Sequence, residues 1–296
     1  MVRALVLLWL LALALPLGAG TAAAHGDGGL GPEAHIPRIV ALEPPIPGLD
    51  VRVIESGHRL RIDNHTGLPV EVLADSGPRT YEPLVADGGT ARWTDHRVRA
   101  AAADPVPVEG RRAWAIPMRV GDTAVTLRGE QVWPDPPASL PWWLATLLAA
   151  AGAALVGTRA ARHRSWAVAL AGVTLAVVAA HVVHVLGSAL IVEDQPLLQV
   201  ALGAAGPALL AWVLGLLGAV LTVARWGYGP LLCSLSGALF ALVTVFNANN
   251  FGYPVLPFAW AADLDRLTVV LTLGAGAGLF LAGFAALREL SPAPTA

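Results

Sequence analysis

Two histidines stand near the end of a long apolar run, at positions 181 and 184 of the stretch from Trp166 to Gly187. Residues at this spacing share one face of an α-helix. A neutral imidazole facing hydrocarbon would leave its ring nitrogens unpaired, so this face is expected to meet protein, water or a bound ion. Imidazole nitrogen is a favourable ligand for copper. His181 and His184 are therefore candidate ligands of a copper ion.

A third candidate ligand is His25. The segment from Met1 to Ala24 has the form of an export signal, with Arg3 ahead of an apolar centre and small residues before position 25. Cleavage after Ala24 would make His25 the new N-terminus. Its α-amine, with an ordinary pKa of about 7.7 to 8.0, could then chelate a metal ion together with the ring. Two alternatives stay open: an uncleaved anchor, and a Gly-rich lead over residues 25–35 whose histidines bind nothing.

A fourth, secondary candidate is His96, in the cluster Trp93-Thr94-Asp95-His96-Arg97. An aspartate beside a histidine can orient an imidazole that binds metal. The same cluster could instead be an exposed strand end with an Asp–Arg pair of little energetic value. The sequence leaves both readings open.

The elements that must position these residues fall into two parts. Residues 25–134 show short alternating strands separated by turns, which predicts an exported antiparallel β-sandwich. The pattern does not distinguish an immunoglobulin-like from a cupredoxin-like topology. A Pro-rich linker over residues 135–140 leads to an apolar part over residues 141–288, followed by a short tail over 289–296. The predicted strands are 51–54, 60–63, 68–73, 91–98, 113–120 and 123–132.

The apolar part predicts a bundle of five transmembrane helices, since it contains five runs long enough to cross a bilayer. Arginines gather in the first and third gaps between runs and at the C-terminal end, whereas acidic residues gather in the second and fourth gaps. By the positive-inside rule, this places the C-terminus in the cytoplasm and the N-terminal domain outside. The runs are about 141–157, 166–187, 197–224, 227–246 and 267–287.

With this orientation, polar residues gather at the outer ends of the helices, beneath the exported domain. Such a gathering suggests a ligand or ion site. The alternative is that these side chains only cross-link helices, a contribution of roughly 0.6 kcal/mol per hydrogen bond on average. The residues are His181, His184, Gln199, Asn247, Asn249, Asn250, Asp263 and Asp265.

Charge and cysteine content exclude several classes of protein. Acidic side chains outnumber basic ones between His25 and Leu140, and there is no basic run of the kind that binds nucleic acid. The single cysteine, Cys233, rules out an intrachain disulfide and a cysteine-based metal cluster. Phosphate-binding loops, dinucleotide fingerprints and nucleophile elbows are absent, which makes an enzyme improbable.

The chain resembles uncharacterised five-helix membrane proteins of high-GC Gram-positive bacteria, which have a signal peptide and an exported β domain. The resemblance spans nearly the whole chain but implies no function. It is carried by residues 43–48 (EPPIPG), 60–67 (LRIDNHTG), 254–260 (PVLPFAW) and 265–266 (DR). The family's Trp-His-Asp-His-Arg-x-His-Trp-Met motif is matched at Trp93, Asp95, His96 and Arg97, whereas Thr94 and Arg99 replace two of its histidines.

The chain also has a weaker similarity to the copper-resistance pairing of a periplasmic CopC-like domain with a CopD-like membrane protein. This similarity rests on the histidine that would begin the exported protein after cleavage and on the polar residues at the helix ends. The leading expectation is therefore a multi-pass protein in the lipid bilayer that binds or handles a small ligand, copper first, at its outer face. The alternative is an anchored envelope scaffold whose β domain docks another protein. A transporter is disfavoured because the runs show no repeat and carry no charge at depth.

Overall fold

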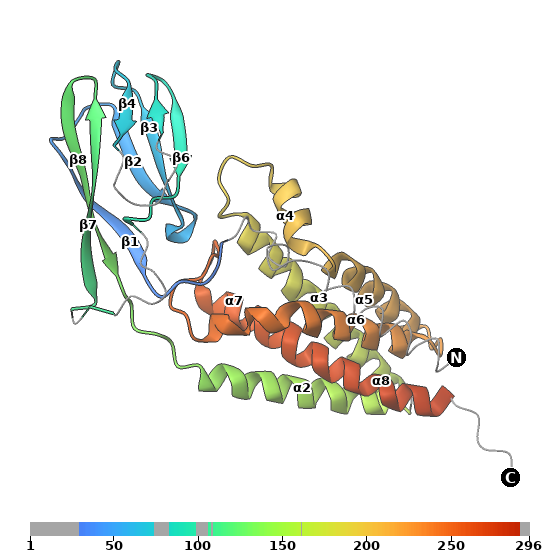
Figure 1. Ribbon diagram of the computed structural model, residues 1–296. Coiled ribbons are helices and arrows are strands. Elements are labelled where there is room, and N and C mark those ends of the chain that lie inside the picture. The colour runs from blue at the N-terminus through green and yellow to red at the C-terminus, as the bar shows by residue number, and fades with distance from the viewer. Residues whose placement is uncertain (1–29, 74–82, 99–105, 108, 161, 291–296) are drawn as a thin grey trace, which may run out of the picture.

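The computed structural model describes residues 30–73, 83–98, 106–107, 109–160 and 162–290. The chain forms a β domain followed by a helical domain, and the two lie end to end (Figure 1). The predicted signal segment and His25 lie outside the described residues.

The β domain consists of two antiparallel sheets. The larger has the strand order β1-β8-β7-β4-β5 and the smaller has the order β2-β3-β6. The strands are β1 (Ile36–Glu43), β2 (Leu49–Ile54), β3 (Arg59–Asn64), β4 (Val70–Val72), β5 (Leu84–Val85), β6 (Thr90–Trp93), β7 (Arg111–Val120) and β8 (Thr123–Val132). A short 3₁₀ turn, η2 (Glu55–Gly57), joins β2 to β3.

The core of the β domain lies between the two sheets. Leu60 and Ile62 from the smaller sheet share one buried apolar cluster with Ile116 and Leu127 from the larger. Inward and outward residues alternate along these strands, as the sequence pattern predicts for a sheet with one solvated face. An antiparallel β domain ahead of the helices is therefore confirmed.

The predicted strands correspond to β2, β3, β4, β6, β7 and β8, with shifts at their ends. Two strands were not predicted. β1 contains Pro37, and a proline within a run argues against a strand unless the run lies at a sheet edge, as β1 does. β5 is only two residues long and gives no periodic signal.

The helical domain begins at Leu140, directly after the extended linker. Within the described part of the chain, four helices are long and apolar enough to cross a membrane, and five if one sharply bent pair is counted as a single span. The elements are α2 (Leu140–Ala160), α3 (Arg164–Ala189), α4 (Leu197–Ala205), α5 (Ala208–Val223), α6 (Gly229–Thr244), η3 (Val245–Phe251), α7 (Ala262–Val269), the π-helical η4 (Val270–Ala275) and α8 (Gly276–Leu290).

The bent pair is α4 and α5, whose axes differ in direction by 80°. Pro207 has no N–H to continue the helical hydrogen bonds, and Gly206 takes a positive φ of 44° that favours glycine. The third apolar run thus forms two helices with a sharp bend between them.

Glycines allow close approach between helices. A Cβ on Gly274 would overlap the backbone oxygen of Thr146, and one on Gly278 would overlap that of Ala150. A Cβ on Gly276 would lie 2.8 Å from the backbone oxygen of Gly237 on α6. Glycines of η4 and α8 therefore pack against α2, and a glycine of α8 also packs against α6.

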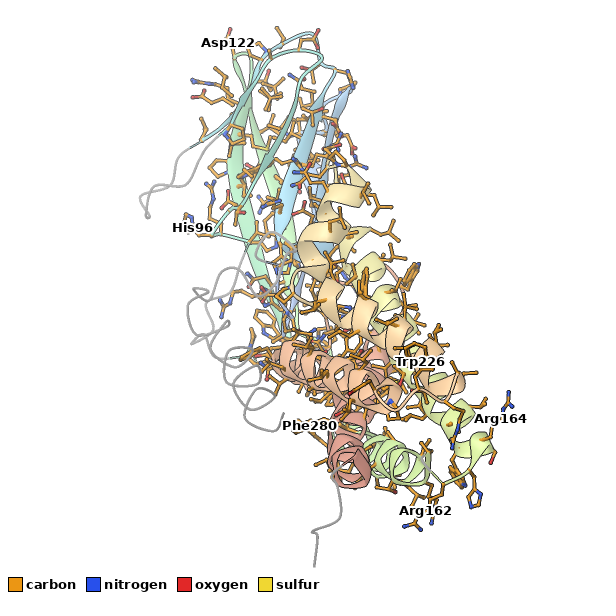
Figure 2. All side chains as sticks on the ribbon, turned by 90° about the vertical axis from the view of Figure 1, so that its right-hand side faces the viewer. His96, Asp122, Arg162, Arg164, Trp226 and Phe280 are labelled. Carbon is orange, nitrogen blue, oxygen red and sulfur yellow. The ribbon has the colours of Figure 1, made fainter. Side chains whose placement is uncertain are left out.

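The helical domain has one end beside the β domain and one end away from it (Figure 1). Arg162, Arg164 and Trp226 lie at the end away from the β domain (Figure 2). The starts of α2 and α7 and the end of α3 lie at the other end, beside the β domain (Figure 1).

Within the described residues, the β domain contacts the helical domain through a backbone pair and through a group of ion pairs. Glu33 and Val255 form an antiparallel backbone pair, with N···O distances of 2.9 and 3.2 Å. Arginines of the smaller sheet also contact the loop between α3 and α4, whose acidic residues are Glu193 and Asp194.

Candidate functional site

His181 and His184 lie on one face of α3, near its β-domain end. Their ring centroids are 6.0 Å apart. His181 is buried, and His184 is mostly covered. The face therefore meets protein rather than lipid, as expected for two imidazoles in an apolar helix.

His184 is held from both sides. Its Nδ1 lies 2.6 Å from Oδ1 of Asp265, and its Nε2 lies 3.0 Å from Nδ2 of Asn247. Because a carboxylate only accepts and an amide NH₂ only donates, Nδ1 carries the proton and Nε2 accepts; this assignment follows from the hydrogen-bond network. His184 thus has one nitrogen lone pair, on Nε2, which accepts a hydrogen bond from the amide of Asn247.

Asp265 is itself fixed and almost fully buried, with 1% of its surface exposed. Its second oxygen accepts a hydrogen bond of 2.6 Å from Nδ2 of Asn250. The backbone oxygen of Asn250 accepts from Nε of Arg266 at 3.0 Å, and Arg266 also donates to the backbone oxygen of Tyr253 at 2.6 Å. The carboxylate therefore has hydrogen-bond partners, which a buried charge requires.

His181 has different partners. The indole N–H of Trp212 on α5 donates to its Nδ1 at 3.2 Å. Because Nδ1 accepts, the proton of this neutral imidazole lies on Nε2. The ring also packs against Phe240, at a centroid distance of 5.2 Å.

The loop between η3 and α7 covers this group. The ring of Phe258 stacks on that of His184 at 6.4 Å, and the backbone N–H of Ala259 donates to the carbonyl of Gly187 at 2.9 Å. A Cβ at Gly187 would overlap the Phe258 ring, so the close approach depends on that glycine. We call His181, His184, Trp212, Asn247, Asn250 and Asp265 the polar centre.

The other polar residues predicted for these helix ends do not join the polar centre. Gln199 and Asn249 are exposed. Asp263 is also exposed, and its carboxylate pairs with Arg266 at 2.6 Å.

His96 lies elsewhere, in the turn after β6 on the β domain (Figure 2). The neighbouring Asp95 binds Arg97 through both oxygens, at 2.8 and 2.7 Å, and accepts from the indole of Trp93 at 3.2 Å. Burial favours the neutral form of Asp95, but the hydrogen bonds from Arg97 outweigh it and lower the pKa of Asp95 below its ordinary value. The cluster thus contains a buried Asp–Arg pair, not an exposed one.

Of the three predicted ligands that the structure describes, His181 and His184 lie together and His96 lies apart from them. In the described ranges of the chain, no three His, Cys, Asp or Glu side chains are grouped as a metal site would need. An ion at the polar centre would therefore take its protein ligands chiefly from this histidine pair.

Sequence reasoning missed Trp212 and Phe258. Trp212 lies within an apolar helix, where an indole usually signals packing, and nothing local marks it as the donor to His181. Phe258 lies in a loop whose path depends on the Glu33–Val255 pair, a contact between residues far apart in the chain.

A comparison of the chain with known proteins finds no matching family model, curated protein or solved structure.

Proposed function

We propose that this chain is a multi-pass membrane protein with an extracytoplasmic β domain, and that it binds a small ligand at the polar centre beneath that domain. The arginine-rich end of the bundle would then face the cytoplasm, in accordance with the positive-inside rule. Copper is the ligand to test first.

The observation that carries the proposal is the contact of His184 with buried Asp265. In metal sites, a carboxylate commonly accepts the N–H of a ligating imidazole, which fixes the tautomer and makes the other nitrogen a better ligand. Here Asp265 holds Nδ1 at 2.6 Å, which leaves the Nε2 lone pair for a ligand once Asn247 turns aside. His181, one helical turn earlier, would supply the second nitrogen.

Copper suits this donor set because it accepts imidazole nitrogen readily. Metal binding also needs a neutral imidazole, whose free nitrogen carries the lone pair that binds the ion. A site beneath a domain junction is furthermore a common position for small-ligand binding.

Copper titration of the purified full-length chain in detergent tests the proposal. We expect one copper ion per chain in the wild type, loss of binding in His184→Ala, and binding about 10- to 100-fold weaker in Asp265→Asn, since outer partners of metal ligands typically contribute that much. His163→Ala is a matched control, because His163 is an exposed histidine just before the opposite end of the same helix.

Two results would overturn the proposal. One is the absence of stoichiometric binding to the wild type. The other is binding that persists in His184→Ala but is lost in His25→Ala, which would move the site to the predicted new N-terminus.

An anchored envelope scaffold is the second candidate, and one observation favours it. The imidazoles of the polar centre already have hydrogen-bond partners, and the β domain is joined to the bundle by ion pairs and a backbone pair. Crosslinking in membranes distinguishes the two functions: a scaffold gives one dominant protein neighbour whose yield does not change when copper is chelated.

A further inference from the structure

The outward face of the smaller sheet carries a row of arginines. Arg52 lies opposite Arg61 on the neighbouring strand, and Arg61 lies opposite Arg92. Like charges directly opposite one another destabilise a sheet. The row therefore needs acidic partners.

Part of the negative charge that compensates these arginines comes from the β domain itself. Nε of Arg61 contacts the two oxygens of Asp63 at 3.1 and 3.0 Å, and Asp63 also accepts from the Thr90 hydroxyl at 2.6 Å. Glu55, whose side chain is fully buried, pairs with Arg59 at 2.8 Å and lies 3.8 Å from Arg92.

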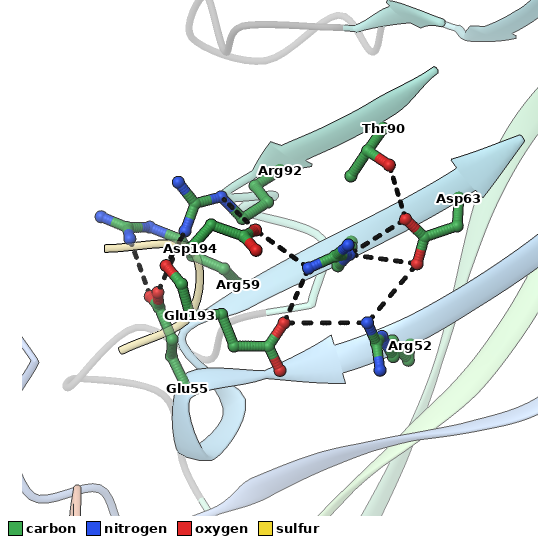
Figure 3. A network of polar contacts seen from close by, with 9 residues as sticks. Arg52, Glu55, Arg59, Asp63, Thr90, Arg92, Glu193 and Asp194 are labelled. Atoms are coloured by element: carbon green, nitrogen blue, oxygen red, sulfur yellow. Dashed lines mark hydrogen bonds and ion pairs between the residues drawn. The ribbon is translucent and has the colours of Figure 1, made fainter. Parts of the chain in front are cut away.

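Further negative charge beside the arginines comes from the helical domain. Nη1 of Arg61 contacts Glu193 at 3.0 Å and Asp194 at 2.9 Å (Figure 3). Arg52 lies 3.8 Å from Glu193, and Arg92 lies 3.7 Å from Asp194. Arg92 also donates to the backbone oxygen of Glu193 at 2.5 Å. The row thus holds both the side chains and the backbone of the α3–α4 loop.

This loop leads directly into α4, which is weakly packed. Only Val200 and Ala205 of its nine residues are buried. Its other end is the 80° bend at Gly206 and Pro207. Few buried contacts and a break at one end are features of segments that open at low free energy.

We infer that the arginine row is an electrostatic latch for α4: its ion pairs with Glu193 and Asp194 fix the loop, and breaking them lets α4 turn about the Gly206–Pro207 bend. The backbone pair and the ion pairs between the domains then have separate roles. The Glu33–Val255 pair holds the domain on the bundle, and the arginine row holds α4. The inference does not depend on the bound ligand proposed above.

Spin-label distances in the full-length chain test the latch. Leu198 on α4 and Leu84 on β5 are both strongly exposed, at 70% and 71%, and can be replaced by labelled cysteines after Cys233→Ala removes the buried native thiol. We expect a narrow distance distribution with the native latch. It should broaden in the double variant Glu193→Gln/Asp194→Asn, which keeps the side-chain shapes and removes the charges.

High salt tests the same point without any change to the latch. Exposed charges are screened within about 3 Å at 1 M ionic strength, so the distribution should broaden as sodium chloride is raised. Glu71→Gln is the matched control, because it breaks an ion pair with Arg119 within the β domain only. The control should leave the distribution unchanged.

A second label pair, Leu84 with Leu147 on α2, shows whether α4 moves alone. We expect this distance to stay narrow in every variant. The inference is wrong if the Leu198 distribution is unchanged in both the double variant and high salt, since packing alone would then hold α4. It is also wrong if the Leu147 distribution broadens equally, since the arginines would then hold the whole domain.

Discussion

The hydrogen-bond partners of His181 and His184 place the protons of the two rings on different nitrogens. His184 donates from Nδ1 to Asp265, whereas His181 accepts at Nδ1 from Trp212. A metal ion needs a lone pair from each ring. His181 must therefore either release Trp212 or shift its proton before it can act as a ligand with His184.

Trp212→Phe should accordingly strengthen copper binding. The change removes the indole N–H and leaves Nδ1 of His181 free. The expected gain is roughly fivefold in affinity, the equivalent of one hydrogen bond of about 1 kcal/mol. Competition with a copper chelator measures it, and ¹⁵N chemical shifts of His181 report the change of tautomer.

Trp226→Phe is the control, because Trp226 is exposed at the other end of the bundle. Unchanged or weaker binding in Trp212→Phe would show that His181 has only a packing role.

At the scale of single residues, helical spacing alone predicts that His181 and His184 share one face. The gathering of Asn247, Asn250 and Asp265 near His184 agrees with the predicted orientation, which places all three at the same ends of their helices. The tautomers could not be predicted in the same way. They depend on Trp212, whose direction is set by the rotation of α5 against α3, and a uniformly apolar helix gives no pattern that fixes its rotation.

At the scale of elements, α8 and α2 approach closely because glycines remove side chains from their contact. Gly278→Ala should destabilise the bundle by about 1 to 3 kcal/mol, the usual range for overpacking, since the added methyl would overlap the carbonyl of Ala150. Thermal unfolding in detergent, followed by circular dichroism, measures the loss.

Gly152→Ala is its control on α2, because no atom lies within 4 Å of the position where a Cβ would stand. This variant should be as stable as the wild type or slightly more so, since alanine favours a helix over glycine by about 1 kcal/mol. Equal effects of the two substitutions would refute close glycine packing.

The helices themselves were largely predictable because long apolar runs separated by charged gaps leave few alternatives. The division of the third run into α4 and α5 was not. Proline at position 207 signals a kink, but whether the chain bends slightly or by 80° depends on what holds the other end of α4. Here the α3–α4 loop is held by arginines more than a hundred residues earlier in the chain.

At the scale of the whole molecule, alternation along β2, β3 and β6 predicts that Arg52, Arg61 and Arg92 share the outward face. Their partners could not be predicted, since pairing with Glu193 and Asp194 requires the β domain to lie over that loop. Both domains were recognisable from composition, but their mutual placement depends on a few contacts without a sequence signature.

Acid should destabilise the β domain at its arginine row. The Thr90 hydroxyl and then the Arg61 guanidinium lower the pKa of Asp63 below its ordinary value, and the hydrogen bond to Asp63 raises the pKa of Arg61. A carboxyl with a lowered folded pKa stabilises the fold fully above its unfolded value of about 3.9, and this contribution is lost as pH falls through the folded value.

Thermal unfolding between pH 7 and pH 3 tests this effect. Asp63→Asn should be less stable than the wild type at pH 7 and should lose less stability in acid. Asp122→Asn, at the tip of the β domain away from the helices, should retain the acid response of the wild type. An Asp63→Asn profile that coincides with the wild type would show that this carboxyl does not stabilise the β domain.

In a bilayer, the break between α4 and α5 would also affect the surrounding lipid. The sixteen residues of α5 extend only about 24 Å at 1.5 Å per residue, less than a hydrocarbon layer of about 30 Å. In a bilayer, the acyl chains beside α5 would have to compress to match its length, or the apolar residues of α4 would have to enter the hydrocarbon layer. The thickness of a bilayer would therefore affect the tilt of α4.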